Sequence, residues 1–440
     1  MNRPQPPFYA QSALPDAPTA YGAPFWLAYV GNTLTLVAVS LLYRYADFVV
    51  YLGGTEWHLG WIVGVGMVGS LAVRAALGVG IDHYGPRAVW LAALALFSAS
   101  CLAHLAVGSC HGPVIYLLRI AWCCSVAGIF GAAMTFVSRR APEQRMAEMI
   151  GMLGTSGFVG MVLGTQLGDL LLGTRTIEWR QIQLMFVAAA LATAIAMIFV
   201  YLATRGEVRL PRIERPPLID LLRRHLPPAV LMVGIAMGVG LSLPTTFLRT
   251  YAAELDIPRM GLFFSVYAPT ALITRLLTRR LPERFGTTPM ILVGLAALAV
   301  SQGLFLLVRV EWQLIIPGVT YGFAHAVLFP SVVAAGSRAF PQQHRGLGTT
   351  LMLGTWDAGQ LIGAPAAGAI LHCSGWFQLP PYPTLFVTMA GLLATVGLAF
   401  AWLRRPGRLP HRAADRPRED RVGEATHEPA LVPESPVGDG

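Results

Sequence analysis

Residues 181–203 read QIQLMFVAAALATAIAMIFVYLA, an apolar run without a single charged side chain. A helix needs about 20 such residues to cross the hydrocarbon core of a bilayer. The run does not alternate between polar and apolar residues as a barrel strand does, and an isolated strand cannot satisfy its backbone hydrogen bonds in lipid. The stretch is therefore predicted to be a transmembrane α-helix.

The whole 440-residue chain has the same character, with 55% hydrophobic and only 12% charged residues. A soluble domain carries about 25% charged residues, so a water-soluble protein is excluded. The net charge of +9 comes from arginines that punctuate the apolar runs instead of forming a patch, which argues against a nucleic-acid partner. Composition thus predicts an integral membrane protein.

Twelve apolar stretches can be marked along the chain, and each is predicted to be a spanning helix. They lie near residues 25–48, 57–78, 87–107, 112–136, 147–172, 181–203, 226–250, 258–280, 288–308, 312–336, 346–372 and 382–403. The predicted fold class is therefore all-α and integral to the membrane, with twelve transmembrane helices.

The distribution of arginines predicts the orientation. Connections after the even-numbered stretches hold fifteen arginines and those after the odd-numbered stretches hold four, so the even connections and both termini are expected in the cytoplasm. The predicted organisation is a disordered cytoplasmic tail (1–24), a first six-helix bundle (25–203), a cytoplasmic linker (204–225), a second six-helix bundle (226–403) and a disordered cytoplasmic tail (404–440).

The two predicted bundles resemble each other. Arg74, Asp82, Tyr84 and Gly85 recur 201 residues later as Arg275, Glu283, Phe285 and Gly286, and Arg145 with the MLGT of 152–155 recurs 200 residues later as Arg345 with the MLGT of 352–355. Two copies of an even number of spans lie parallel, related by an axis along the membrane normal. This pseudo-symmetry predicts a cavity between the halves.

Residues 78–87, GVGIDHYGPR, resemble the signature G-x-x-x-D-R-x-G-R-[RK] of the major facilitator superfamily of transporters. His83 and Pro86 depart from it, whereas Gly78, Asp82, Gly85 and Arg87 are in register. The resemblance implies a cytoplasmic gate that favours the outward-open state; its alternative is that Asp82 only caps the next helix. The expected gate residues are Gly78, Asp82, Gly85 and Arg87, with Glu283 and Gly286 from the second copy.

Charges inside the predicted spans indicate function, because they are costly in lipid and tend to face a cavity or a partner. Asp357 lies near the middle of its span, flanked by Trp356 and Gln360, and a buried carboxyl group can exchange a proton as access alternates. The alternative is a helix-packing hydrogen bond. His325 could share that proton or be a satisfied core residue.

Four further charges are candidates for the coupling or substrate site. The superfamily resemblance implies proton coupling for Arg119, and snorkelling to the interface is the alternative. Arg44 and Asp47 share a helix face and can pair, and Arg249 is expected near the same outer mouth. Together Arg44, Arg119 and Arg249 outnumber Asp47 and Asp357, which favours an anionic or zwitterionic substrate. Arg74 and Arg275 are expected to snorkel or to join the gate.

Other features narrow the function. Span five carries four closely spaced glycines, which predict tight helix contact. The five cysteines (Cys101, Cys110, Cys123, Cys124 and Cys373) lack metal-ligand spacing and are interpreted as small hydrophobic residues. No metal and no other cofactor is expected. The sequence contains no Walker, HExxH or nucleophile-elbow motif, so the chain is not predicted to be an enzyme.

The predicted function is secondary active transport of a small solute by alternating access, resembling bacterial efflux members of the superfamily. We expect proton-coupled export of an amphipathic metabolite or drug. The alternatives are import of a small organic anion, either proton-coupled or facilitative, and a non-transporting receptor on the same fold. The expected partners are a small-molecule solute, protons and the lipid bilayer, with a functional monomer in a bacterial inner membrane.

Overall fold

The computed structural model describes residues 21–142, 145–173, 177–206, 223–278, 281–341 and 344–405. Side chains of residues 77–83, 147, 282 and 283 are outside that description. Most of the two predicted tails and of the predicted linker also lie outside the described residues. The predicted boundaries of the two bundles therefore stay a prediction.

Every element of the described ranges is helical, which confirms the predicted fold class. The first half contains α1 (Ala23–Leu41), η1 (Leu42–Arg44), α2 (Tyr45–Tyr51), α3 (Glu56–His104), α4 (Pro113–Arg140), α5 (Met146–Leu172) and α6 (Trp179–Ala203). The second contains α8 (Pro228–Glu254), α9 (Gly261–Thr278), α10 (Leu281–Phe285), α11 (Thr287–Leu304), η3 (Phe305–Leu307), η4 (Glu311–Leu314), α12 (Ile315–Arg338), α13 (Arg345–Ser374), η6 (Gly375–Phe377) and α14 (Pro381–Leu403).

The second and third predicted spans form the single element α3, which is kinked at Gly85. Gly85 has φ 79° and ψ 157°, and Gly286, at the equivalent position of the second half, has φ 82° and ψ 168°. Only glycine adopts this backbone region readily. The predicted repeat is therefore present in the backbone as well as in the residue types.

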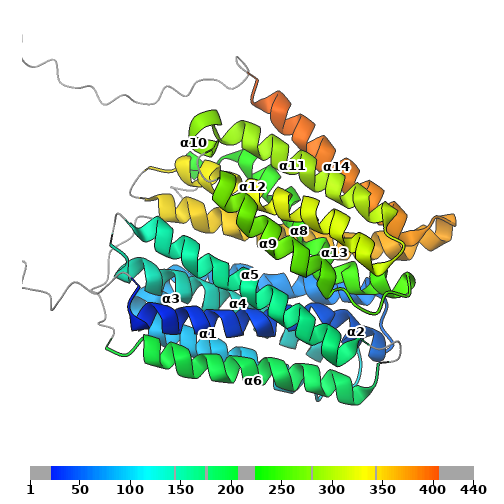
Figure 1. Cartoon of the computed structure of the whole chain (residues 1–440), viewed down its shortest axis with the longest axis horizontal. Coiled ribbons are helices and arrows are strands. Elements are labelled where there is room, and N and C mark those ends of the chain that lie inside the picture. Colours follow the sequence, from blue (N-terminus) through cyan, green and yellow to red (C-terminus); the bar gives the residue numbers. More distant parts are fainter. Residues whose placement is uncertain are drawn as a thin grey trace, which may run out of the picture.

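Helix packing repeats in the same way. In the first half α1 packs on α5 and α6, and α3 packs on α4 and α6; in the second half α8 packs on α13 and α14, and α9 and α11 pack on α12. The predicted close contact of span five is also present, because a Cβ on Gly160 would lie 2.6 Å from the Thr33 carbonyl oxygen of α1. Figure 1 shows the two groups of helices lying one above the other.

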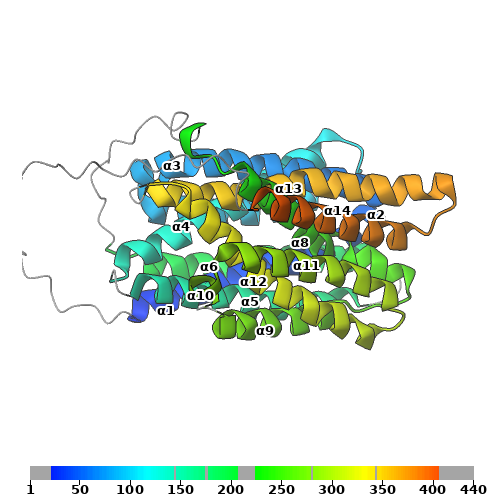
Figure 2. The same ribbon diagram turned by 90° about the horizontal axis from the view of Figure 1, so that it is seen from above.

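Eleven helices within the described ranges are long and apolar enough to cross a membrane. The remaining predicted span, 346–372, is the 30-residue helix α13, whose composition is more polar. That polarity has a structural reason, because α13 packs against α3 of the other half as well as α8 of its own. Figure 2 shows α3 and α13 running side by side.

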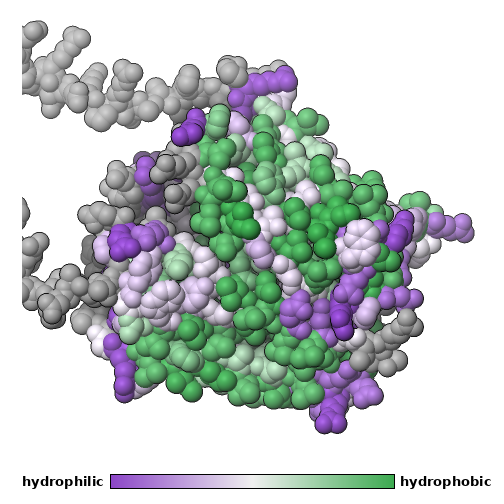
Figure 3. Space-filling view, in the orientation of Figure 1, coloured by the Kyte–Doolittle hydropathy of each residue, from purple (hydrophilic) through white to green (hydrophobic). Residues whose placement is uncertain are grey.

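The molecule has two ends, which we call the near end and the far end. The near end is where α1 begins and α14 ends; the far end holds the turns at residues 52–55, 105–112, 255–260 and 375–380 (Figure 1). Apolar residues cover the middle of the face seen in Figure 3, and polar residues gather toward both ends. The surface thus matches an integral, multi-pass membrane protein.

Candidate functional site

The two halves meet where α3 packs on α13 and α5 packs on α9. Toward the far end this contact is tight, because a Cβ on Gly368 would lie 2.7 Å from the Glu56 carbonyl oxygen. Toward the near end it loosens: a Cβ on Gly354 would find only Leu71, at 3.9 Å, and one on Gly346 would find nothing within 4 Å. The contact between α3 and α13 is therefore closer toward the far end than toward the near end.

A buried cluster of four charges, Arg44, Asp47, Asp169 and Arg249, closes the far end. Arg44 Nη1 lies 3.0 Å from Asp47 Oδ2, and its Nη2 lies 2.7 Å from Asp169 Oδ1. Arg249 Nε lies 2.7 Å from Asp47 Oδ1, an ion pair whose N–H direction falls outside hydrogen-bond geometry. Because Arg249 belongs to α8 and the others to the first half, the cluster joins the halves.

Backbone groups complete the far-end cluster. Arg44, fully buried, also donates to the carbonyl oxygens of Leu172 and Pro258, each 2.7 Å away. Asp169 accepts hydrogen bonds from the backbone N–H of Met260 (3.2 Å) and of Gly261 (2.6 Å), which begins α9. A carboxylate from α5 thus caps a helix of the other half, where the helix dipole favours negative charge.

The predicted pairing of Arg44 with Asp47 is confirmed, and Arg249 lies beside them as expected. The predicted excess of Arg44, Arg119 and Arg249 over Asp47 and Asp357 stays a prediction for the whole cavity; within this cluster, Asp169 brings the count to two arginines and two carboxylates. Asp169 was missed, although it is the single charge in the apolar stretch 149–172 and could have been found on that ground.

A second bridge joins the halves nearer the middle of the bundle. Asp357 of α13, buried, accepts hydrogen bonds at Oδ2 from Ser70 Oγ and Arg74 Nε of α3, both at 2.5 Å. Arg74 Nη2 lies 3.4 Å from Asp357 Oδ1. The expectation that Arg74 snorkels or joins the gate is therefore wrong, because its guanidinium group is turned into the interface by a carboxylate 283 residues away.

Aromatic rings gather beside this bridge and come from both halves. His325 of α12 accepts or donates a hydrogen bond at Nδ1 with the Tyr267 hydroxyl. Its ring centroid lies 5.7 Å from that of Trp356, which is half-buried, and 6.3 Å from that of Phe158 of α5. His325 thus contacts Tyr267 instead of sharing a hydrogen bond with Asp357. Gln360 lies one turn beyond Trp356 and is also half-buried.

Two arginines, Arg119 buried and Arg275 partly buried, contact rings instead of carboxylates. Arg119 lies over Tyr45 and Trp122, with its Cζ 4.5 Å and 4.1 Å from the ring centroids. Arg275 Cζ lies 5.4 Å from the Phe158 centroid. Neither has an ion pair within the described part of the chain, and the Nε of each lacks a hydrogen-bond partner there. Aromatic faces attract cations, but they do not neutralise them.

The predicted gate lies largely outside the described side chains, which exclude those of Gly78, Asp82 and Glu283. Gly85 and Gly286 form the two kinks, and Arg87 lies over the Tyr201 ring of its own half at 4.7 Å. The gate and the central cavity stay predictions.

Exposed charges at the near end pair within one half. Arg145 Nη2 lies 2.9 Å from Glu148 Oε1, which also accepts a 2.6 Å hydrogen bond from the Tyr21 hydroxyl. That hydrogen bond raises the pKa of Tyr21 above its ordinary value. The near-end pair does not join the halves.

Comparison with known proteins agrees with the fold. The family model described as Major Facilitator Superfamily matches residues 25–310 and 232–435. Among solved structures, the nucleoside transporter NupG is similar with a TM-score of 0.71 at 13% identity, covering 87% of this chain and 98% of that one. A D-xylose-proton symporter gives a TM-score of 0.67 at 13% identity, covering 87% and 97%. At this identity the structures establish the fold alone.

Curated relatives match over shorter segments. The inner membrane transport protein RhmT of Escherichia coli is 31% identical over 150 residues, which is 32% of this chain and 33% of the relative. Multidrug resistance protein 1 of Bacillus subtilis is 28% identical over 176 residues, 40% of this chain and 43% of the relative. The class D tetracycline resistance protein of Salmonella ordonez is 32% identical over 154 residues, 32% and 38%.

The matched segments thus span between a third and under half of these relatives, whereas the family model spans nearly the whole helical region. This agreement confirms the predicted superfamily and the prediction that the chain is not an enzyme. The twelve-helix plan, the repeated glycine kinks and the family match lead to one assignment: the chain belongs to the Major Facilitator Superfamily.

Proposed function

We propose that the chain is a secondary active transporter that moves a small solute by rocking its two halves about their interface. The observation that carries the proposal is the Asp357–Arg74 bridge, a buried ion pair whose members belong to different halves. A contact of this kind has to break when the halves separate. Breaking the Asp357–Arg74 ion pair is therefore a step at which the transport cycle can be controlled.

We propose a proton as the coupling ion. Protonation of Asp357 neutralises the carboxylate and removes its attraction for Arg74, so one proton weakens the bridge. Water can reach this ion pair from the near end, where the contact between α3 and α13 is looser. The Arg74 side chain is 19% exposed. With the arginine-rich connections in the cytoplasm, the near end faces inward, and this conformation is open toward the cytoplasm.

The proposed substrate is an amphipathic metabolite or drug that is exported. Support comes from the rings beside the bridge, which belong to both halves and include half-buried Trp356. Such pockets combine apolar walls with a few polar groups. Two matched relatives bear the names multidrug resistance protein and tetracycline resistance protein.

Import of a small organic anion is the second candidate. Arg119 and Arg275 are buried or nearly so and contact rings instead of carboxylates within the described residues. Such cations can bind a carboxylate or phosphate group of a solute. If the exported compound is cationic or neutral, Arg119 and Arg275 have no anionic group of the solute to bind.

The opening of the far end can be measured without knowledge of the substrate, and this measurement tests the proposed role of Asp357. Spin labels at Val50 and Trp312, exposed positions on the two halves at the far end, report its opening in a background without the native cysteines. Lowering the pH should lengthen this distance in the otherwise native chain. Asp357→Asn should give the long distance at every pH, because the amide mimics the protonated carboxyl group.

The matched control is Asp256→Asn, at an exposed position with φ 56°, a backbone region that asparagine tolerates. It should keep the pH response. In everted vesicles, Asp357→Asn should abolish accumulation of ethidium or tetracycline driven by a pH gradient, with the control unaffected. A normal pH response of the Asp357→Asn distance would refute Asp357 as the coupling residue.

A further inference from the structure

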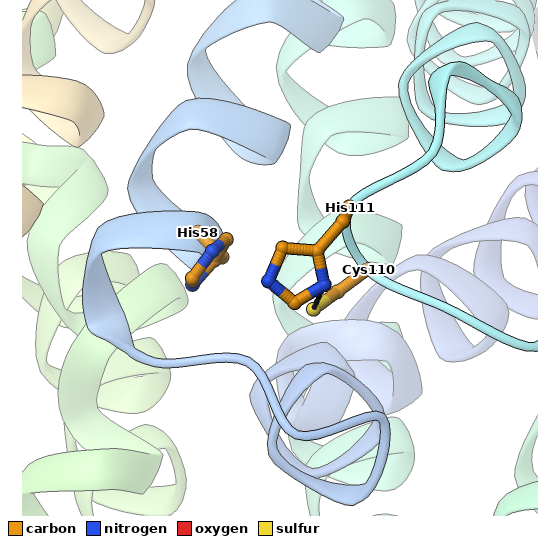
Figure 4. Close-up of side chains that lie close together, drawn as sticks. All are labelled: His58, Cys110 and His111. Atoms are coloured by element: carbon orange, nitrogen blue, oxygen red, sulfur yellow. Dashed lines mark hydrogen bonds between the residues drawn. The ribbon is translucent and has the colours of Figure 1, made fainter.

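Three side chains with metal-binding atoms meet at the far end of the first half. His58 lies in the first turn of α3, and Cys110 and His111 lie in the connection between α3 and α4. One ligand atom from each lies within 4.8 Å of the others. Figure 4 shows the His111 ring between His58 and Cys110, with its hydrogen bond to the sulfur atom.

We propose that His58, Cys110 and His111 bind a divalent transition-metal ion of the zinc class. Thiolate and imidazole are the ligands that Zn²⁺ prefers, at about 2.3 Å for sulfur and 2.0–2.1 Å for nitrogen. Two such ligands at a tetrahedral angle stand roughly 3.6 Å apart. Cys110 Sγ and His111 Nδ1 are already 3.4 Å apart. Metal binding therefore requires loss of the thiol proton and a small inward movement of His58.

The surroundings of the three ligands suit this role. His58 Nδ1 accepts a hydrogen bond from the Thr55 backbone N–H at 3.2 Å and lies 3.1 Å from Thr55 Oγ1. Metal binding at Nε2 would require the other tautomer, in which Nδ1 carries the proton and donates it to Thr55 Oγ1 in place of the backbone hydrogen bond. Cys110 is fully buried, and its thiol contacts the Leu52 carbonyl oxygen at 3.7 Å. His111 is exposed. Three protein ligands with one on the surface leave the fourth tetrahedral position to water.

The metal would link two segments of one half, the start of α3 and the connection that follows α3. The start of α3 is also the part in tight contact with α13, through Glu56 and Gly368. The site does not include the far-end charge cluster or Asp357. Binding should therefore stiffen the far end of the first half, whether or not the proposed transport function holds.

Titration of the purified full chain with Co²⁺ tests the site, with the affinity tag removed and the thiols reduced. One equivalent should bind and produce a thiolate-to-cobalt charge-transfer band, which Zn²⁺ should displace. His111→Gln, at an exposed position, should lower the affinity at least tenfold without unfolding the chain. Cys110→Ser should abolish the charge-transfer band.

Two controls match these variants. His372→Gln removes another exposed far-end imidazole, near Trp57, and Cys373→Ser removes another far-end thiol; both should bind Co²⁺ as the native chain does. Zn²⁺ should also raise the melting temperature of the native chain and not that of His111→Gln. Absence of the charge-transfer band from the native chain, or equal affinity in His111→Gln, would overturn the proposal.

Discussion

The two bridges between the halves differ in how many groups hold them. At the far end, four charges balance two against two, and backbone groups of both halves complete their coordination. At mid-depth, one carboxylate is held by one guanidinium group and one hydroxyl group of the other half. Arg44 is fully buried, whereas the Arg74 side chain is 19% exposed.

This difference gives the two contacts different roles. We call the far-end charge cluster the seal, because many groups hold it together, and the Asp357–Arg74 bridge the switch, because one proton can neutralise its carboxylate. A single proton removes the whole charge of the mid-depth carboxylate, but it leaves the far-end cluster with one carboxylate and several backbone hydrogen bonds. Breaking a buried ion pair by removal of one partner is costly, since the other charge stays in low dielectric. We therefore expect the far-end cluster to determine stability and the Asp357 bridge to determine the response to protons.

The largest effect is expected from Arg44→Met. It leaves Asp47 and Asp169 with one arginine between them, and loss of one partner of a buried ion pair costs about 3–5 kcal/mol. Thermal unfolding in detergent should show a large drop in melting temperature. Arg284→Met, at an exposed near-end arginine, should leave it unchanged.

The double variant Arg44→Met/Asp169→Asn sharpens this test. Neutralising one stranded carboxylate should recover part of the stability lost in Arg44→Met. If Arg44→Met unfolds like the native chain, the far-end cluster is not a stabilising seal.

A smaller effect is expected from Asp169→Asn alone. The amide oxygen can still accept from the Gly261 N–H, but the charge that pairs with Arg44 and the α9 dipole is lost; hydrogen bonds to charged groups contribute about 1.5–3 kcal/mol. The Val50–Trp312 distance should lengthen by population shift while its pH response persists. Asp357→Asn should also give the long distance, but without a pH response. The same pH response in both variants would contradict the distinction between the far-end cluster and the Asp357 bridge.

The smallest effect is expected from Glu148→Gln. Its ion pair with Arg145 is exposed and lies within one half, and exposed pairs contribute little because water and salt screen them. Neither the melting temperature nor the far-end distance should change measurably. A clear change in the far-end distance would mean that the near-end pair also takes part in coupling the halves.

Local sequence patterns predicted much of this molecule. The positions of the spans follow from the length of the apolar runs, and the recurrence of Gly85 as Gly286 is visible in the sequence. The kink at each glycine is seen in the structure, and glycine is the residue that adopts this backbone conformation readily. Arg44 and Asp47 could be paired from sequence because a helix places residues three apart on one face. These are properties of short segments and need no knowledge of the neighbouring helices.

Contacts between segments depended on the tertiary structure. Arg74 meets Asp357 and Asp169 caps a helix of the other half because whole helices pack together, and His58 meets Cys110 and His111 because the connection after α3 folds back onto the start of that helix. Apolar composition decides that a helix enters the membrane, because desolvation acts on each residue separately. Which charges then meet is decided by how the helices pack, since a buried charge must find whatever partner the neighbouring helix presents.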